Sequence, residues 1–214
     1  TGECNREIRT AERSRDESRD CLPNRRGPGI VAVTVRRVGS LVAGRIWMEN
    51  PVEMPTMEIV EADLDCVAHQ RAVVELIDAY AADPMGNGRP LAPQVRDNLI
   101  DGLRRHPTTL IFLAFQGGRA VGIAVCFLGF STFHAKPLVN IHDLAVVADC
   151  RGRQIGRRLL DAVADKARHL HCCKLTLEVQ ENNRRARRLY EAAGFAQAQY
   201  QEGTGGSLFY AKPL

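Results

Sequence analysis

The chain lacks several features that would assign it to a well-marked class of protein. None of its apolar runs is long enough to cross a bilayer, and it does not begin with a signal-peptide pattern. Its seven cysteines are odd in number and include no C-x-x-C pair, and the vicinal Cys172 and Cys173 precede an apolar strand as packing residues would. We therefore expect a soluble, cytoplasmic protein with reduced cysteines, no membrane partner and no bound metal.

The chain also lacks a large excess of charge of one sign. The formal net charge is only +4 over 214 residues, which is compatible with a polyphosphate ligand but is weaker than the basic footprint of a dedicated nucleic-acid binder. We expect no nucleic-acid partner. With 45% hydrophobic residues, the chain is able to bury the core of one globular domain.

The first 56 residues differ in composition from the rest. Residues 1–26 combine charges of both signs with almost no apolar side chains, which predicts disorder. Residues 30–47 are more apolar but are interrupted by arginine and glycine, so an unstructured extension is favoured over a short strand or a membrane-surface segment. An arginine-rich arm for nucleic acid is a further alternative, weakened by the nearby acidic residues. We expect 1–56 to be a disordered or non-native extension and 57–214 to be the folded domain.

From residue 57 the hydrophobic pattern becomes regular. Apolar spacings of three and four predict helices, and short apolar runs between turn residues predict strands. The expected helices are 65–82, 93–105, 155–170 and 183–193, and the expected strands are 57–62, 108–115, 120–130, 138–147, 174–179, 195–200 and 207–212. The Gly117-Gly118 pair predicts a tight hairpin. This order indicates a mixed α/β fold with helices on both faces of the sheet.

A glycine-punctuated basic turn stands between the strand 138–147 and its helix. Residues 149–160 read D-C-R-G-R-Q-I-G-R-R-L-L. The first N–H groups of a helix have no internal partner and lie at the positive end of the helix dipole, so they attract an anion. Gly152 and Gly156 leave the backbone open to a phosphate, and Arg151, Arg153, Arg157 and Arg158 surround the turn with charged donors. The alternative is an ordinary turn with solvated arginines.

The chain resembles the GNAT superfamily of N-acetyltransferases in four features that follow one another in order. They are the two hairpin strands, the strand 140–146, the turn 151–156, which is similar to the signature Q/R-x-x-G-x-G/A, and the segment 178–195 with its asparagine, tyrosine and Gly-Phe pair. The resemblance covers 57–214. It implies a mostly antiparallel, twisted sheet of about six or seven strands with helices on both faces.

The same resemblance implies acetyl-CoA as cofactor, with its pyrophosphate on the turn. The residues implied to bind it are Leu144, Ala145, Val146, Arg151, Gly152, Arg153, Gln154, Ile155, Gly156, Arg157, Asn182 and Arg185. The turn departs from the family pattern at Gln154, where glycine is usual. If this position needs a positive φ the glutamine is strained, and if it lies in the first helical turn it is harmless.

The catalytic residues implied are Tyr190, His142 and Asp143. Tyr190 matches a general acid for the departing thiolate, and its phenol, with a pKa of about 10, has the acidity to protonate it. The alternative is a core aromatic on one helical face. Strand alternation would place His142 on the same face as Asn140 and Leu144, and Asp143 on the opposite face. Either His142 or Asp143, acting through water, would serve as the general base. A His142 that is hydrogen-bonded at a sheet edge and has no catalytic role is equally compatible with the pattern.

The function expected is transfer of an acetyl group from acetyl-CoA to a primary amine of a small molecule, by direct attack in a ternary complex. Residues 129–143 are also similar to the diamine and polyamine acetyltransferase branch, although His142 stands where that branch has glutamate. Glu178 and Glu181 flank the expected cleft, and Glu181 needs no function beyond solvation. A protein N-terminus or lysine is the alternative acceptor, and a non-catalytic acyl-CoA binding module is the alternative class. Many members of the superfamily form homodimers, so a second copy of the chain is the other expected partner.

Overall fold

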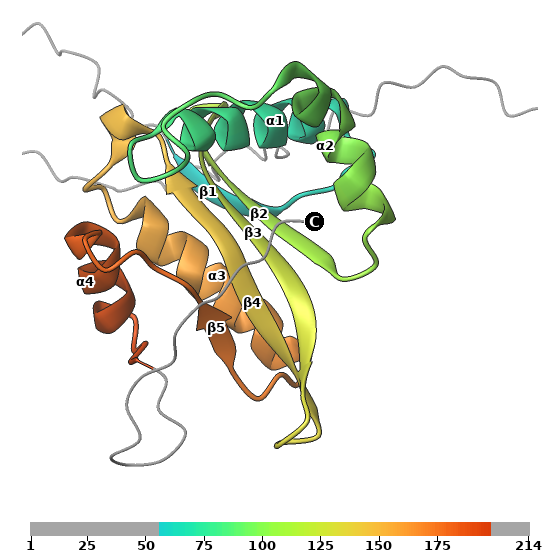
Figure 1. The fold of residues 1–214 in the computed structure, drawn as a ribbon, viewed down its shortest axis with the longest axis vertical. Helices are drawn as coiled ribbons and strands as arrows, with labels where there is room; N and C mark the ends of the chain where they lie inside the picture. The colour runs from blue at the N-terminus through green and yellow to red at the C-terminus, as the bar shows by residue number, and fades with distance from the viewer. Residues whose placement is uncertain (1–55, 198–214) are drawn as a thin grey trace, which may run out of the picture.

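One sheet forms the centre of the protein. The structure, a computed structural model, describes residues 56–197. Its strands are β1 (Met57–Glu61), β2 (Thr109–Gln116), β3 (Arg119–Ser131), β4 (Lys136–Val146) and β5 (Leu175–Leu177). They form a five-stranded sheet in the order β1-β2-β3-β4-β5, antiparallel except for the parallel pair of β4 and β5 (Figure 1).

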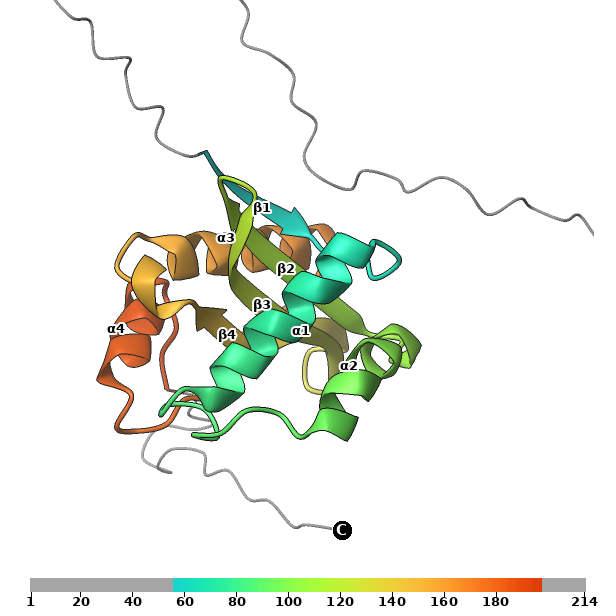
Figure 2. The ribbon, with the colours of Figure 1, turned by 90° about the horizontal axis from the view of Figure 1, so that it is seen from above.

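Helices cover both faces of this sheet. They are α1 (Val67–Ala82), α2 (Pro93–Arg105), α3 (Ile155–His169) and α4 (Arg184–Ala192), with a short 3-10 turn, η1 (Ala148–Cys150), before α3. Seen from above, α1 crosses one face of the sheet with α2 beside it, and α3 runs along the other face (Figure 2). The fold is therefore a mixed α/β layer structure with helices on both faces, as the sequence predicted.

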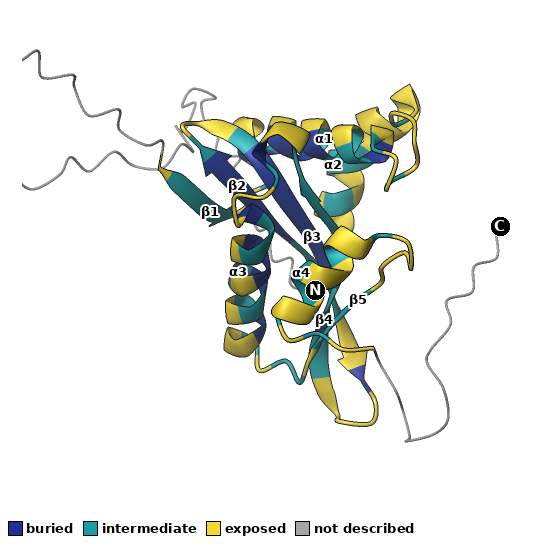
Figure 3. Cartoon of the chain, turned by 90° about the vertical axis from the view of Figure 1, so that its left-hand side faces the viewer, coloured by how far each residue is buried: buried dark blue, intermediate teal, exposed yellow. Residues whose placement is uncertain are grey.

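Two apolar clusters hold these layers together. On one face, Leu113 and Ile123 pack with Val73 of α1, and on the other, Ala124 packs with Leu159 of α3. Each fully buried leucine or isoleucine stabilises the fold by roughly 1.5–3 kcal/mol. Figure 3 shows the central strands buried, whereas α4 is exposed over most of its surface and, like α2, contains no fully buried residue. The helix nearest the open end of the sheet is thus held without a fully buried side chain.

The turn between β2 and β3 follows the predicted hairpin chemistry. Gly117 and Gly118 have φ values of 57° and 82°. Two successive positive φ angles are the geometry of the tight hairpin turn that matches strand twist, and glycine adopts them without a Cβ clash. The glycine pair therefore fixes the register of the two most buried strands.

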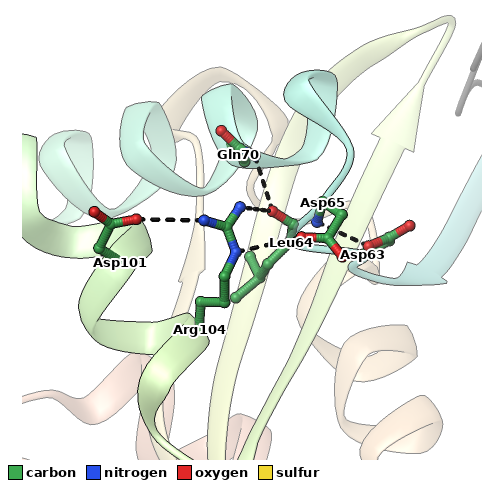
Figure 4. A network of polar contacts seen from close by, with 6 residues as sticks. All are labelled: Asp63, Leu64, Asp65, Gln70, Asp101 and Arg104. Atoms are coloured by element: carbon green, nitrogen blue, oxygen red, sulfur yellow. Dashed lines mark hydrogen bonds and ion pairs between the residues drawn. The ribbon is translucent and has the colours of Figure 1, made fainter. Parts of the chain in front are cut away.

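A polar network fastens α2 to the start of α1. Arg104 Nη2 donates to the Leu64 carbonyl at 2.6 Å, and Gln70 Nε2 donates to the same oxygen at 2.9 Å (Figure 4). The Arg104 guanidinium also lies 3.3 Å from Asp65 and from Asp101. Arg104 of α2 therefore links this helix to residues 64 and 65, the segment that precedes α1.

The differences from the sequence predictions lie near the end of the described chain. The strand predicted over 174–179 is only three residues long, and residues 195–197 are irregular. The strand 207–212, the rest of 195–200 and the extension 1–55 lie outside the described residues. Among residues 56–197, no helix combines the length and apolarity needed to cross a bilayer.

Candidate functional site

The sheet opens where β4 and β5 part. The parallel pairing joins only Val139, Asn140 and Ile141 of β4 to β5, while β4 continues as far as Val146. After β5 the chain turns away into α4, which lies beside the opening (Figure 1). The outer edge of β4 beyond Ile141 therefore has no strand neighbour in the described part of the chain.

Backbone groups of β4 point into this opening. The Val147 N–H donates to Val121 of β3, while the Val146 carbonyl accepts a bond from the Arg151 side chain on the opposite edge. Since the N–H and C=O groups of successive strand residues point to alternate edges, the Leu144 N–H points into the opening together with those of Val146. This edge is able to bind an extended ligand through backbone hydrogen bonds.

A β-bulge stands at the start of the open edge. Val125 pairs with Asp143 and Cys126 with Ile141, so His142 is an extra residue without a partner in β3. A bulge interrupts the alternation of side chains. The predicted facing was therefore wrong beyond Ile141: Leu144 packs with the α3 cluster, whereas Asp143 shares its face with Val125 on the α1 side.

The bulge directs His142 outward. Its ring lies 5.5 Å from the ring of Phe127 in an edge-on arrangement, and the residue is exposed. Asp143 is half-buried, and burial raises the pKa of its carboxyl, an effect that the neighbouring His142 partly offsets. A solvent-facing imidazole thus lies beside a carboxyl that holds its proton more tightly than usual.

One cavity, of about 280 Å³, lies between the end of β4 and the first turn of α3, and we call it the turn cavity. Most residues predicted to bind the cofactor line it: Leu144, Ala145, Val146, Arg151, Gly152, Gln154, Ile155, Gly156, Arg157 and Arg185. Arg153 and Asn182 are not among the lining residues. The adjacent Asn183 lines the cavity instead and caps α4 by accepting the Ala186 N–H at 3.1 Å.

The turn before α3 has the open backbone expected of an anion site. Gly152 has a φ of 82°, and Gln154, at the helix N-cap, has a φ of 63° and makes no side-chain capping bond. Of the two alternatives for Gln154, the strained one applies, because this conformation costs an L-residue roughly 1–2 kcal/mol. The first N–H groups of α3 are available to a ligand.

Gly156 has a second role besides access to the backbone. A Cβ built on it would lie 3.0 Å from Cδ2 of Leu189 in α4. The glycine therefore permits α4 to approach α3 closely, which brings the lining residues of α4 to the turn cavity.

The arginines of the turn are not equivalent. Arg157 pairs with Asp161 at 2.9 Å and donates to the Ala192 carbonyl at 2.9 Å. Arg151 pairs with Asp83 at 2.6 Å, and its hydrogen bond lowers the pKa of that carboxyl. Arg153 and Arg158 are exposed and line neither this cavity nor its neighbour. Of the four arginines expected to surround the turn, Arg151 and Arg157 line the turn cavity, and Arg153 and Arg158 do not.

A second cavity, of about 370 Å³, adjoins the first along the bulge, and we call it the bulge cavity. It is lined by Tyr80, Met85, Ile141, His142, Leu144, Glu178, Val179, Gln180, Asn183, Ala186 and Tyr190. No lysine or arginine is among these described residues, and Glu178 contributes a carboxylate. Asp143 lines neither cavity.

Two tyrosines stand where the cavities meet. Tyr80 of α1 and Tyr190 of α4 line both. Burial raises the pKa of Tyr190 to about 12, and Tyr80 adds to that shift; burial also raises the pKa of Tyr80, with a contribution from Asp143. The Tyr190 ring packs edge-on against Phe195 with centroids 5.9 Å apart, so the predicted packing role and a place at the cavity junction coexist.

Sequence reasoning missed the contribution of α1 and its following loop. Tyr80, Asp83 and Met85 line the turn cavity, although they precede the motif by more than sixty residues. Tyr80 is one of the regularly spaced apolar positions that predict its helix, and that spacing gives no signal of a place at a cavity. Within the described residues no group of three or more histidine, cysteine or acidic side chains could hold a metal ion.

Comparison with known proteins shows that the chain is similar to N-acetyltransferases. An uncharacterized N-acetyltransferase of Bacillus subtilis, YhfO, is 35% identical over 97 residues, which are 45% of this chain and 62% of that protein. A thialysine N-epsilon-acetyltransferase of Bos taurus is 32% identical over 88 residues, 41% of this chain and 51% of that protein. The chain thus spans between half and two thirds of these relatives.

A solved structure and a family profile match more of the chain than these relatives do. The aminoglycoside N-acetyltransferase AAC(6')-Iy, solved in complex with CoA, superposes with a TM-score of 0.59 over 75% of this chain and 97% of its own, at 16% identity, which supports the shared fold. The profile of the Acetyltransferase (GNAT) family matches residues 73–195, more than half of the chain. The chain belongs to the acetyltransferase (GNAT) family.

Proposed function

We propose that the protein is an acetyl-CoA-dependent N-acetyltransferase that acts on the primary amine of a small molecule by direct attack in a ternary complex. The observation that carries the proposal is the pair of adjoining cavities of opposite charge at the split of β4 and β5. The turn cavity contains Arg151, Arg157 and Arg185, and the bulge cavity contains Glu178.

The turn cavity suits an acyl-CoA. Its helix N-terminus and arginines match the pyrophosphate, and the open edge of β4 matches an extended pantetheine arm. The CoA complex of AAC(6')-Iy supports this cofactor by analogy of fold. A thioester carried along β4 would reach the cavity junction, where the Leu144 N–H is a donor for the developing oxyanion.

The bulge cavity suits a small cationic amine. Its volume of about 370 Å³ lies at the lower end of ordinary small-molecule sites. The Met85 carbonyl of the loop after α1 accepts a bond from Gln180 at 3.4 Å, which links two residues that line the cavity. Transfer to a small amine is what the names of the Bos taurus relative and of AAC(6')-Iy also report for those proteins.

The side chains divide the proton transfers between them. His142 lines the bulge cavity and takes the proton of the attacking ammonium, directly or through water, while the charge of Asp143 stabilises the protonated imidazole. Tyr190 at the junction protonates the departing thiolate. The presence of His142 and Tyr190 in the lining of the bulge cavity supports their two roles, whereas Asp143, which lines neither cavity, acts through its neighbour His142.

The test is thiol release from acetyl-CoA by the full chain with a panel of diamines, polyamines, amino acids and aminoglycosides, alongside peptides with a free N-terminus or lysine. We expect release with at least one small amine and intersecting initial-rate patterns. Release with peptides alone would favour a protein acceptor. Saturable CoA binding with no release on any amine would favour a binding module, and either result contradicts the proposal.

A further inference from the structure

An ion pair joins the loop after α1 to the turn before α3. Arg151 Nη2 donates to Asp83 Oδ2 at 2.6 Å across 68 residues of sequence. The side chains are only 33% and 16% exposed, so water screens this pair less than the other pairs around the turn. The pair connects two segments that line the turn cavity from different parts of the fold.

Arg151 retains donors for a ligand while it holds Asp83. Its Nε donates to the Val146 carbonyl at 2.9 Å, and one N–H of Nη2 goes to Asp83. A guanidinium has five N–H donors, so three remain. Arg151 is therefore able to bind an anion on the turn and Asp83 at the same time.

Asp83 in turn organises the loop. Its other carboxylate oxygen, Oδ1, accepts the Met85 N–H at 2.8 Å. Met85 lines both cavities, and its carbonyl accepts the bond from Gln180. Residues 83–90 thus form a bridge from the phosphate-binding turn to the wall of the bulge cavity.

We propose that Asp83 and Arg151 are positioning residues that couple the two cavities: an anion bound on the turn orders loop 83–90 and so completes the site for the amine. This inference rests on the proposed function, because it takes the pyrophosphate of CoA as the anion. Coupling of this kind is reciprocal, so an ordered loop also tightens binding of CoA.

The test is hydrogen–deuterium exchange of the full chain with and without coenzyme A. In the wild type, CoA is expected to slow exchange in 151–158 and in 83–90. Asp83→Asn keeps an oxygen for the Met85 N–H but removes the charge that faces Arg151. In this variant we expect protection of 151–158 to persist, protection of 83–90 to fall by at least half, and the Kd for CoA to rise about fivefold.

Asp149→Asn is the matched control. It removes the pair of Asp149 with Arg119, at 2.7 Å and with side chains 61% and 60% exposed, two residues before Arg151. It is expected to show the wild-type pattern. Unchanged or faster exchange of 83–90 with CoA in the wild type, or full protection of that loop in Asp83→Asn, would overturn the coupling. Absence of protection at 151–158 in the wild type would instead contradict the cofactor site itself.

Discussion

The two cavities are built from the same opening in the sheet but differ in charge and in origin. The turn cavity is formed largely by one continuous segment, 144–157, with arginines and a helix N-terminus. The bulge cavity is lined by residues of α1, its following loop, the bulge, the segment after β5 and α4, and its one carboxylate is Glu178. A chain that binds an anionic cofactor and a cationic amine needs both potentials within one opening.

The largest effect is expected from a substitution that removes the proposed general base from the bulge cavity and leaves the turn cavity unchanged. His142→Gln keeps a polar side chain of similar size but removes the proton acceptor, so we expect kcat to fall about 10³-fold, within the usual range for a general base. The Kd for acetyl-CoA, measured by calorimetry, should stay within twofold. If turnover is unchanged, the proton leaves through Asp143 or water.

The next effect lies at the junction of the cavities. Tyr190→Phe removes the proposed acid and is expected to lower kcat about 10²-fold, the lower limit for such a group, since a thiolate is a good leaving group. Because burial raises the pKa of Tyr190 to about 12, its hydroxyl remains protonated through the neutral range. Tyr80→Phe is the matched variant, with the same atom removed at the same junction. A greater loss in Tyr80→Phe than in Tyr190→Phe would transfer the acid role to α1.

The two cavities differ in how much of each the sequence predicts, because one is formed mostly by a continuous segment and the other by distant segments. The turn cavity depends in large part on local spacing, because glycine, arginine and an amphipathic helix at 151–160 predict an anion site before any tertiary contact is known. The order of helices and strands was likewise readable from hydrophobic period, as the agreement of α2 with the predicted 93–105 shows.

The bulge cavity and the α1 side of the turn cavity depend on long-range contacts that spacing does not encode. Nothing in the local sequence indicates that Tyr80 lines both cavities together with Tyr190 of α4, or that Asp83 pairs with Arg151. The bulge at His142 was missed for a related reason. Alternation predicts faces only while both strands advance in step, and one extra residue reverses every later assignment.

A smaller effect separates charge from proton transfer. Asp143→Asn should lower turnover about tenfold, or about 1.4 kcal/mol, by removing the charge beside His142. Burial raises the folded-state pKa of Asp143 above the unfolded value of about 3.9. The folded state therefore binds the proton more tightly, and stability falls as the pH rises through that interval. The variant should unfold at a higher temperature than the wild type at pH 7, and the acid limb of its kcat/KM profile should flatten. A lower unfolding temperature would contradict this account.

A smaller effect, on KM, is expected when the carboxylate of the bulge cavity is removed at Glu178. Glu178→Gln should raise KM for a cationic amine up to about fivefold, the most that an exposed charge contributes, with the effect shrinking at high salt. KM for acetyl-CoA should not change. Glu181→Gln is the matched control, because Glu181 is exposed and lines neither cavity. Equal effects of the two variants would mean that the bulge cavity does not select charge.

The smallest effect concerns Gln154, the residue that departs from the family pattern in the turn. Its φ of 63° costs a residue with a Cβ roughly 1–2 kcal/mol, whereas glycine adopts it freely but loses about 0.5–1 kcal/mol in unfolded-chain entropy. Gln154→Gly should therefore stabilise the protein by about 0.5–1 kcal/mol, or raise Tm by about 1–3 °C in calorimetry. Gln154→Ala, which keeps the Cβ, should give no such gain.

The Kd of the same two variants for CoA tests whether the Gln154 side chain binds the cofactor. The N–H groups that would hold a pyrophosphate belong to the backbone, so neither variant should change the Kd for CoA more than about twofold. If both variants weaken CoA binding further, the Gln154 side chain is itself a ligand, and its strain is retained for a contact that glycine cannot make. The turn cavity would then depend on a side chain at a position where the family motif has glycine.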